Sequence, residues 1–107
     1  MNSGAEATVI GDDVTIGHAA LLHACTLHDR AFVGMGALVL DGAVIESEGV
    51  LAAGSVLPPG KRIASGQLWM GNPAVMVRVL DAAGRARFAR NAKNYAELSQ
   101  RYRCGAG

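Results

Sequence analysis

The side chains best suited to chemistry are three histidines in the first third of the chain. His18, His23 and His28 stand five residues apart, and they are the only histidines among the 107 residues. An imidazole serves as a metal ligand or as a proton carrier near neutral pH. A solvated or interface histidine is the ordinary alternative. The elements that carry these residues must therefore be established before either role is argued.

A repeat of six residues organises the region that holds the histidines. Aliphatic residues recur at this spacing, and each follows a small residue by two positions. The aliphatic positions are Leu27, Val33, Val39, Ile45, Leu51 and Leu57, and the small ones are Cys25, Ala31, Ala37, Ala43, Gly49 and Ser55. The series extends back through Leu22, Ile16 and Ile10, with a single five-residue step from Leu22 to Leu27. Nine short repeats result.

This period predicts an all-β solenoid. A helix would repeat its apolar residues every 3.6 positions and an ordinary strand every two, and neither period matches. If each unit supplies one strand and one corner, three units make a turn of about 18 residues. About three coils then stack as a parallel β-helix with the aliphatic residues inside. Glycines are expected at its tight corners, at Gly11, Gly17, Gly34, Gly42 and Gly54.

The second half of the chain is expected to close the solenoid. Pro58-Pro59-Gly60 predicts an exit from the last strand, followed by a loop to about Pro73. From Asp81, a suitable N-cap, apolar residues with helical spacing predict an α-helix. They are Phe88, Ala92, Tyr95, Leu98 and Tyr102. One domain is expected, with the β-helix and its exit loop over 1–80 and the helix packed on it over 81–107.

Composition excludes several classes of function. Ten basic residues face nine acidic ones, and although residues 81–107 are basic, no aromatic-interleaved surface or known motif accompanies that charge. Nucleic acid is therefore not an expected partner.

The longest apolar stretch, about Ala31 to Leu40, is too short for a membrane span. Residues 1–6 do not resemble a signal, and Cys25 and Cys104 form no disulfide framework, so a cytoplasmic location is expected.

Within the repeat, His23 and His28 directly follow an inward aliphatic residue and His18 stands two positions after one, so all three rings are expected to point outward. Two imidazoles five residues apart on a strand cannot reach the same ion within one chain. Metal binding would therefore require a second subunit. Cys25 occupies a small inward position and is expected to be a buried thiol. The pairs Asp12-Asp13 and Glu46-Glu48 are expected to be surface charges at corners.

Three segments carry a resemblance to a known family. They are Val14-Thr15-Ile16-Gly17-His18 continuing through His23 to Leu27, then Val33-Gly34-Met35-Gly36-Ala37, and finally Pro58 to Ile63 with Leu68-Trp69-Met70-Gly71-Asn72-Pro73-Ala74. The chain resembles the gamma-class carbonic anhydrase-like hexapeptide proteins over nearly its whole length. The resemblance implies a left-handed parallel β-helix and a homotrimer. It also implies that His18 and His23 match two zinc ligands of the family, which reach one ion from opposite sides of a subunit interface.

The resemblance further implies a reaction. Zinc held by three imidazoles lowers the pKa of a bound water to about 7, which suits reversible hydration of carbon dioxide, a small-molecule substrate. The family's third histidine lies a few tens of residues before Gly17-His18, whereas seventeen residues precede His18 here and none is histidine. The chain is similar to the later part of a family member. Weakened binding of zinc, or of another divalent metal, is expected, and strand edges at the amino end favour end-to-end association.

Two other functions stay open. One is a non-catalytic oligomeric β-helix that keeps the scaffold without the chemistry. The other is the activity of the wider hexapeptide family, whose acyltransferases and thioesterases use an interface histidine as general base on coenzyme A esters. No catalytic residue is assigned beyond the two metal ligands. His28 has no assigned role, because it stands one repeat further along the chain.

Overall fold

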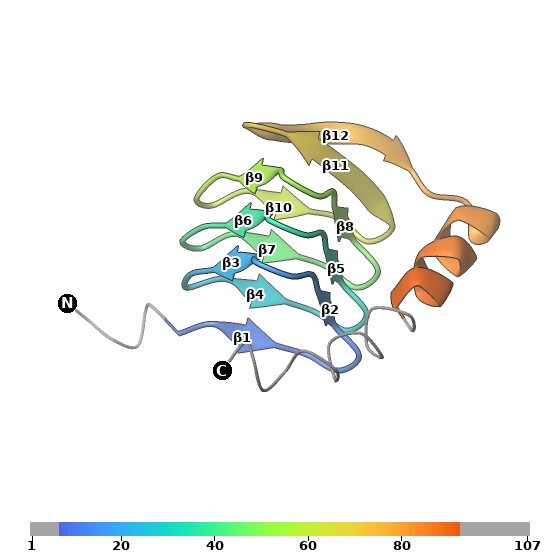
Figure 1. Cartoon of the computed structure of the whole chain (residues 1–107), viewed down its shortest axis with the longest axis horizontal. Helices are drawn as coiled ribbons and strands as arrows, with labels where there is room; N and C mark the ends of the chain where they lie inside the picture. Colours follow the sequence, from blue (N-terminus) through green and yellow to red (C-terminus); the bar gives the residue numbers. More distant parts are fainter. Residues whose placement is uncertain (1–6, 93–107) are drawn as a thin grey trace.

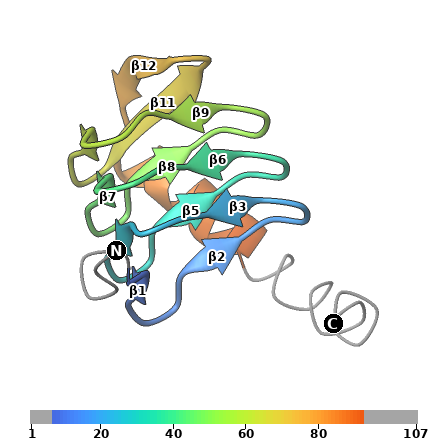
Figure 2. The same ribbon diagram turned by 90° about the vertical axis from the view of Figure 1, so that its left-hand side faces the viewer.

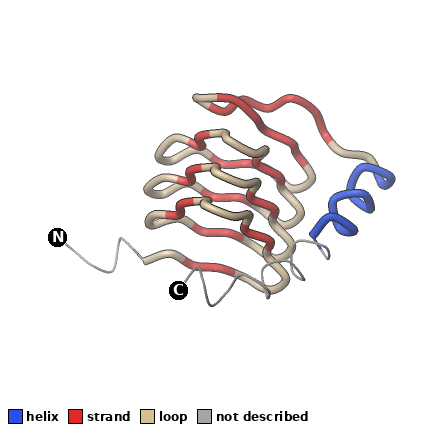
Figure 3. Tube along the Cα trace, viewed as in Figure 1, coloured by secondary structure: helices blue, strands red, loops and turns tan. Residues whose placement is uncertain are grey.

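The six-residue repeat folds into very short strands separated by corners. The computed structural model describes residues 7–92. Figure 3 shows how the strands alternate with the corners along the coils. Two-residue strands run through the repeat region: β1 (Val9–Ile10), β2 (Thr15–Ile16), β3 (Leu21–Leu22), β4 (Thr26–Leu27), β5 (Phe32–Val33), β6 (Leu38–Val39), β7 (Val44–Ile45), β8 (Val50–Leu51), β9 (Val56–Leu57) and β10 (Arg62–Ile63).

Every third strand stacks in parallel on the one before it, which gives a three-sided coil (Figure 1). The three sides are the sheets β1-β4-β7-β10, β2-β5-β8 and β3-β6-β9, the second of which is extended by a terminal hairpin. Leu27 pairs with Ile45, eighteen positions later, but Ile10 pairs with Leu27, only seventeen later. The five-residue step after Leu22 explains the shorter first coil. The fold is the expected left-handed parallel β-helix of about three coils with a C-terminal helix.

The predicted inward positions form the core. The aliphatic side chains from Leu27 onward are at most 1% exposed, and the small residues two positions before them are also buried. Ile16 and Leu22 pack against this core from the first coil, and Ile10 at the open end is 48% exposed. A continuous aliphatic column therefore runs along the axis. Ser55 is its one buried polar member among the described residues, and its hydroxyl oxygen accepts a hydrogen bond from Gly71 N at 3.0 Å.

The glycines serve two different purposes, and only one of them was expected. Gly42 and Gly54 hold φ values of +74° and +71° at their corners, as predicted. Gly11, Gly17 and Gly34 do not have positive φ. They lie where successive coils nearly touch, since a Cβ on Gly34 would stand 2.4 Å from the backbone nitrogen of Ala53. The left-handed corner position is filled elsewhere by residues such as Ala19 and Glu48.

This difference predicts unequal costs for two neighbouring glycines. Gly34→Ala is expected to destabilise the protein by about 3 kcal/mol, because the new methyl group must displace the backbone of the next coil. Gly36→Ala is the matched control, since a Cβ there meets nothing within 4 Å and only the φ of +68° opposes it. Its cost should be about 1 kcal/mol. Urea unfolding at one protein concentration measures both, and equal costs would contradict the close-approach explanation.

The predicted exit at Pro58-Pro59-Gly60 and the loop to Pro73 are wrong. Pro58 to Gly60 form an ordinary corner, and the coil continues into β10, whose Ile63 is fully buried. At this corner a backbone N–H of one coil donates a hydrogen bond to a carbonyl oxygen of the next coil, as Leu40 N does to Leu57 O. Within residues 7–92 no strand lies above β9 in its sheet, so a proline at position 58, which has no N–H to donate, leaves no ladder bond unmade.

Two longer strands replace the predicted loop. β11 (Gln67–Gly71) stacks in parallel on β8, and β12 (Ala74–Val79) turns back antiparallel beside it. The hairpin closes one end of the coil, as the turned view in Figure 2 shows for β2, β5, β8 and β11 stacked in order. The coil therefore continues through β10 and β11, beyond the exit expected after Leu57.

The C-terminal helix begins where the sequence predicts and is described over residues 82–92. The carboxylate of Asp81 accepts a hydrogen bond from Gly84 N at 2.8 Å, which is the geometry of an N-cap. Phe88 packs edge-on against Phe32, with ring centroids 5.2 Å apart, so the helix covers the outer face of β5 and its neighbours. Tyr95, Leu98 and Tyr102 lie outside the described residues. Within residues 7–92 no helix is long and apolar enough to cross a membrane.

Candidate metal centre

The structure places the three histidines at the three corners of one coil. His18 lies between β2 and β3, His23 between β3 and β4, and His28 between β4 and β5. All three are exposed, in agreement with the outward orientation expected from the repeat. Each corner of the prism in this coil therefore presents one imidazole to the surroundings.

The face between His18 and His23 differs from the other two. Its outward residues are Leu21, Leu38 and Val56, which stack directly on one another across β3, β6 and β9. Leu21 is 57% exposed, and the other two are half-buried. No described segment covers this apolar ladder, whereas the helix covers the face of β2, β5 and β8. The outward residues of the third face are mixed, with Thr26 and Arg62 beside Val9 and Val44.

His23 has a carboxylate neighbour that sequence reasoning missed. Asp41 lies in the next coil at the same corner, and its Oδ1 contacts His23 Nδ1 within hydrogen-bonding distance. Eighteen positions separate the two residues, which is one full coil. A search for polar residues one coil apart would have found the pair, because the stacked corners bring such residues together.

A single chain does not assemble a metal site from the described residues. Among residues 7–92 no three histidine, cysteine or acidic side chains gather closely enough to hold an ion. His18 and His23 stand at opposite corners of one face. A metal ion held by both of these residues would therefore need a second subunit.

His28 lies at the corner farthest from the apolar ladder. It stands near Glu46, whose pKa is held below its ordinary value chiefly by a hydrogen bond from Arg62, with a smaller contribution from His28. The predicted surface charge at Glu46 is thus an ion pair with a residue sixteen positions away. His28 does not share the face of His18 and His23, so it cannot complete a site with them there.

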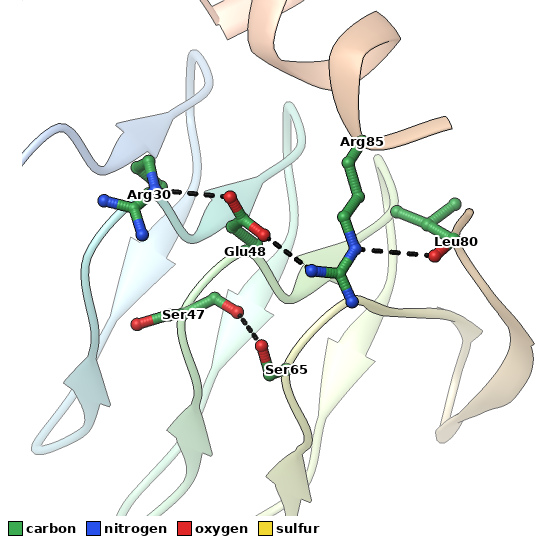
Figure 4. A network of polar contacts seen from close by, with 6 residues as sticks. All are labelled: Arg30, Ser47, Glu48, Ser65, Leu80 and Arg85. Atoms are coloured by element: carbon green, nitrogen blue, oxygen red, sulfur yellow. Dashed lines mark hydrogen bonds and ion pairs between the residues drawn. The ribbon is translucent and has the colours of Figure 1, made fainter. Parts of the chain in front are cut away.

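Glu48 joins the coil to the helix. It accepts hydrogen bonds from Arg30 Nε at 3.3 Å and from Arg85 Nη1 at 2.8 Å, and Arg85 also reaches the carbonyl oxygen of Leu80 (Figure 4). A cavity of about 420 Å³ opens beside this network, lined by Phe32, Val50 and Phe88 among others. None of the histidines lines it. The cavity therefore belongs to the contact between helix and sheet rather than to the candidate metal centre.

Cys25 is buried and carries no disulfide, as its inward position predicts. Burial raises the pKa of its thiol above the ordinary value. Because the thiolate is the reactive form, this cysteine is poorly suited to act as a nucleophile.

Two curated proteins are similar in sequence to this chain. It is 50% identical over 93 residues to "Gamma carbonic anhydrase 1, mitochondrial" of Arabidopsis thaliana, a match covering 87% of this chain and 34% of that protein. It is 40% identical to Protein YrdA of Escherichia coli over 87% of this chain and 50% of that protein. The chain belongs to the gamma carbonic anhydrase-like hexapeptide-repeat family. No family model matches it.

A solved structure supports the hexapeptide-repeat part of this assignment. A hexapeptide transferase family protein from Anaplasma phagocytophilum superposes with a TM-score of 0.74 at 45% identity, covering 89% of this chain and 61% of that one. The chain spans half or less of the two curated relatives named above. Membership of the gamma carbonic anhydrase-like family therefore describes the coils that this chain shares with those proteins.

Proposed function

We propose that three copies of this chain assemble around the face of β3, β6 and β9, and that His18 of one subunit and His23 of the next bind a zinc ion for reversible hydration of carbon dioxide. The observation that carries the proposal is the placement of these two histidines at the two corners that flank the uncovered apolar ladder. Contact between subunits along this face would bring a His18 corner of one copy toward a His23 corner of another.

The apolar ladder supports association through this face. Leu21, Leu38 and Val56 form a column of stacked aliphatic side chains whose burial in an interface would be favourable. The face of β2, β5 and β8 is already covered by the helix, and the face of β1, β4, β7 and β10 carries the charged Arg62 and the polar Thr26 beside Val9 and Val44. A homotrimer is the assembly expected from the family resemblance. The mass of the protein in solution tests this, and a mass above that of three chains would indicate end-to-end association.

The side chains at the proposed site are of the type that binds zinc. Imidazole is a preferred zinc ligand, and a carboxylate behind a ligating histidine is the usual second partner of such a ring. The contact between Asp41 and His23 supplies that arrangement. Two imidazoles from this chain's residues leave the coordination shell less closed than three would. Another divalent metal that accepts imidazole is therefore the alternative occupant.

Within the proposed site, the residues of this chain would bind the metal ion and orient its ligands. His18 and His23 would hold the ion from two subunits, and the ladder between them would exclude bulk water from one side of the interface. Bound zinc would supply Lewis-acid activation of water at neutral pH for addition to carbon dioxide. Asp41 would orient the ring of His23 from the next coil.

Two measurements on the unsubstituted protein test the proposal. Zinc content close to one ion per subunit and detectable hydration of carbon dioxide are expected for the purified trimer. Metal content is measured by elemental analysis and located by anomalous scattering at the zinc edge from a crystal. Trimers that remain free of metal in the presence of excess zinc and inactive in the assay would contradict it and favour a non-catalytic scaffold.

A second candidate function is acyl transfer or thioester hydrolysis on a coenzyme A ester. The observation that favours it is the similarity to a solved hexapeptide transferase family protein at 45% identity. This function predicts that coenzyme A raises the thermal midpoint of the trimer. An unchanged midpoint at millimolar coenzyme A would leave the metal-dependent function as the better account.

A further inference from the structure

Asp41 is held directly against the ring of His23 by the stacking of the coils. The corner that contains Asp41 lies above the corner that contains His23, because β6 pairs with β3 and β7 pairs with β4. Gly42 N donates to the carbonyl oxygen of Ala24 at 2.7 Å, and Gly60 N donates to the carbonyl oxygen of Asp41 at 3.0 Å. The backbone on both sides of the Asp41 side chain is therefore tied to the coils below and above it.

The contact defines which ring nitrogen carries the proton. An ionised carboxylate can only accept hydrogen bonds, so Nδ1 of His23 must be the donor. In a neutral imidazole the other nitrogen, Nε2, then carries the lone pair that a metal requires. Asp41 thus selects one tautomer of His23 and sets the plane of its ring.

We infer that Asp41 is a positioning residue for the metal centre, which keeps His23 in the Nδ1–H tautomer and directs Nε2 toward the ion at the subunit interface. This inference rests on the proposed function for the metal. The tautomer itself is a property of the metal-free chain and can be measured without zinc. Asp41 is not assigned as a ligand, because its carboxylate contacts the nitrogen that faces away from the coordinating one.

The first test measures the tautomer in the metal-free protein. Long-range 1H–15N correlation spectra, recorded at increasing pH until the His23 signals no longer shift, distinguish the two tautomers of the neutral ring. We expect His23 to carry its proton on Nδ1, and Asp41→Ala to populate the Nε2–H form. His28 supplies an internal control whose signals should be unchanged. A His23 ring protonated on Nε2 in the unsubstituted protein, or a tautomer indifferent to Asp41→Ala, would overturn the inference.

The second test measures zinc affinity by competition with a chelating dye. Loss of a carboxylate behind a ligating histidine lowers metal affinity by about 10- to 100-fold, and this is expected for Asp41→Ala. Asp12→Ala removes the same charge from an exposed corner and should leave the affinity unchanged. If the unsubstituted protein binds zinc and Asp41→Ala binds it equally well, the inference fails and the proposed function stands. If the unsubstituted protein binds no zinc, both fail.

Discussion

His18→Ala and His23→Ala are each expected to abolish zinc binding by the assembled protein. The loss of zinc affinity should exceed about 100-fold, the upper range for removing a residue that only hydrogen-bonds a ligand, because each of these substitutions removes a ligand itself. In a trimer built from one variant, every interface lacks the same imidazole, so no intact site remains. Zinc affinity measured by chelator competition, with the mass of the assembly measured in parallel, gives the result.

His28→Ala is the matched control for these two variants. It removes an exposed imidazole from the same coil but from the corner opposite the apolar ladder. Zinc affinity should stay within about twofold of the unsubstituted protein, a change well below 1 kcal/mol. Equal losses in all three variants would indicate non-specific binding of metal by surface histidines. Full zinc binding by His18→Ala would remove that residue from the site.

Ile45→Ala is expected to produce the largest loss of folding stability, about 2–5 kcal/mol. Ile45 is fully buried and packs in the aliphatic column between Leu27 and Ile63. Gly49 leaves room for it, since a Cβ there would lie 2.8 Å from Ile45 Cγ2. The neighbours are fixed by the ladders above and below, so they can collapse only partly into the space left by the missing atoms.

Ile10→Ala makes the same chemical change at the open end of the same column. Ile10 pairs with Leu27, which in turn pairs with Ile45, but Ile10 is 48% exposed. Its substitution should cost less than about 1 kcal/mol. Urea unfolding of both variants at one protein concentration, compared with the unsubstituted chain, measures the difference. A cost for Ile10→Ala as large as that for Ile45→Ala would contradict the described position of the core.

The coil could be predicted from sequence because its burial pattern repeats. One aliphatic residue in six points inward at every side, and no other secondary structure has that period. The end of the coil could not be predicted in the same way. Pro58 and Pro59 suggest an interruption, but a corner with no strand stacked on it tolerates the missing N–H. Whether a strand lies above is a property of the whole stack and not of the local sequence.

The candidate site was predicted only in part for a similar reason. The outward orientation of His18 and His23 follows from the repeat and is confirmed. Asp41 was missed because its relation to His23 spans one coil. The same spacing links Arg30 with Glu48 and Ser65 with Ser47, at eighteen positions each. In a β-helix, polar partners are found by searching at the length of a coil rather than among sequence neighbours.

The most direct test of the shared metal site uses trimers that mix the two histidine variants. His18→Ala and His23→Ala chains are co-expressed with different histidine-free tags, and mixed assemblies are purified through both tags. In such a trimer, one interface joins an intact His18 to an intact His23, so zinc binding of about one third of the unsubstituted level is expected. The single-variant trimers should bind none. Mixed trimers that bind no more zinc than the single variants would contradict a site shared between subunits.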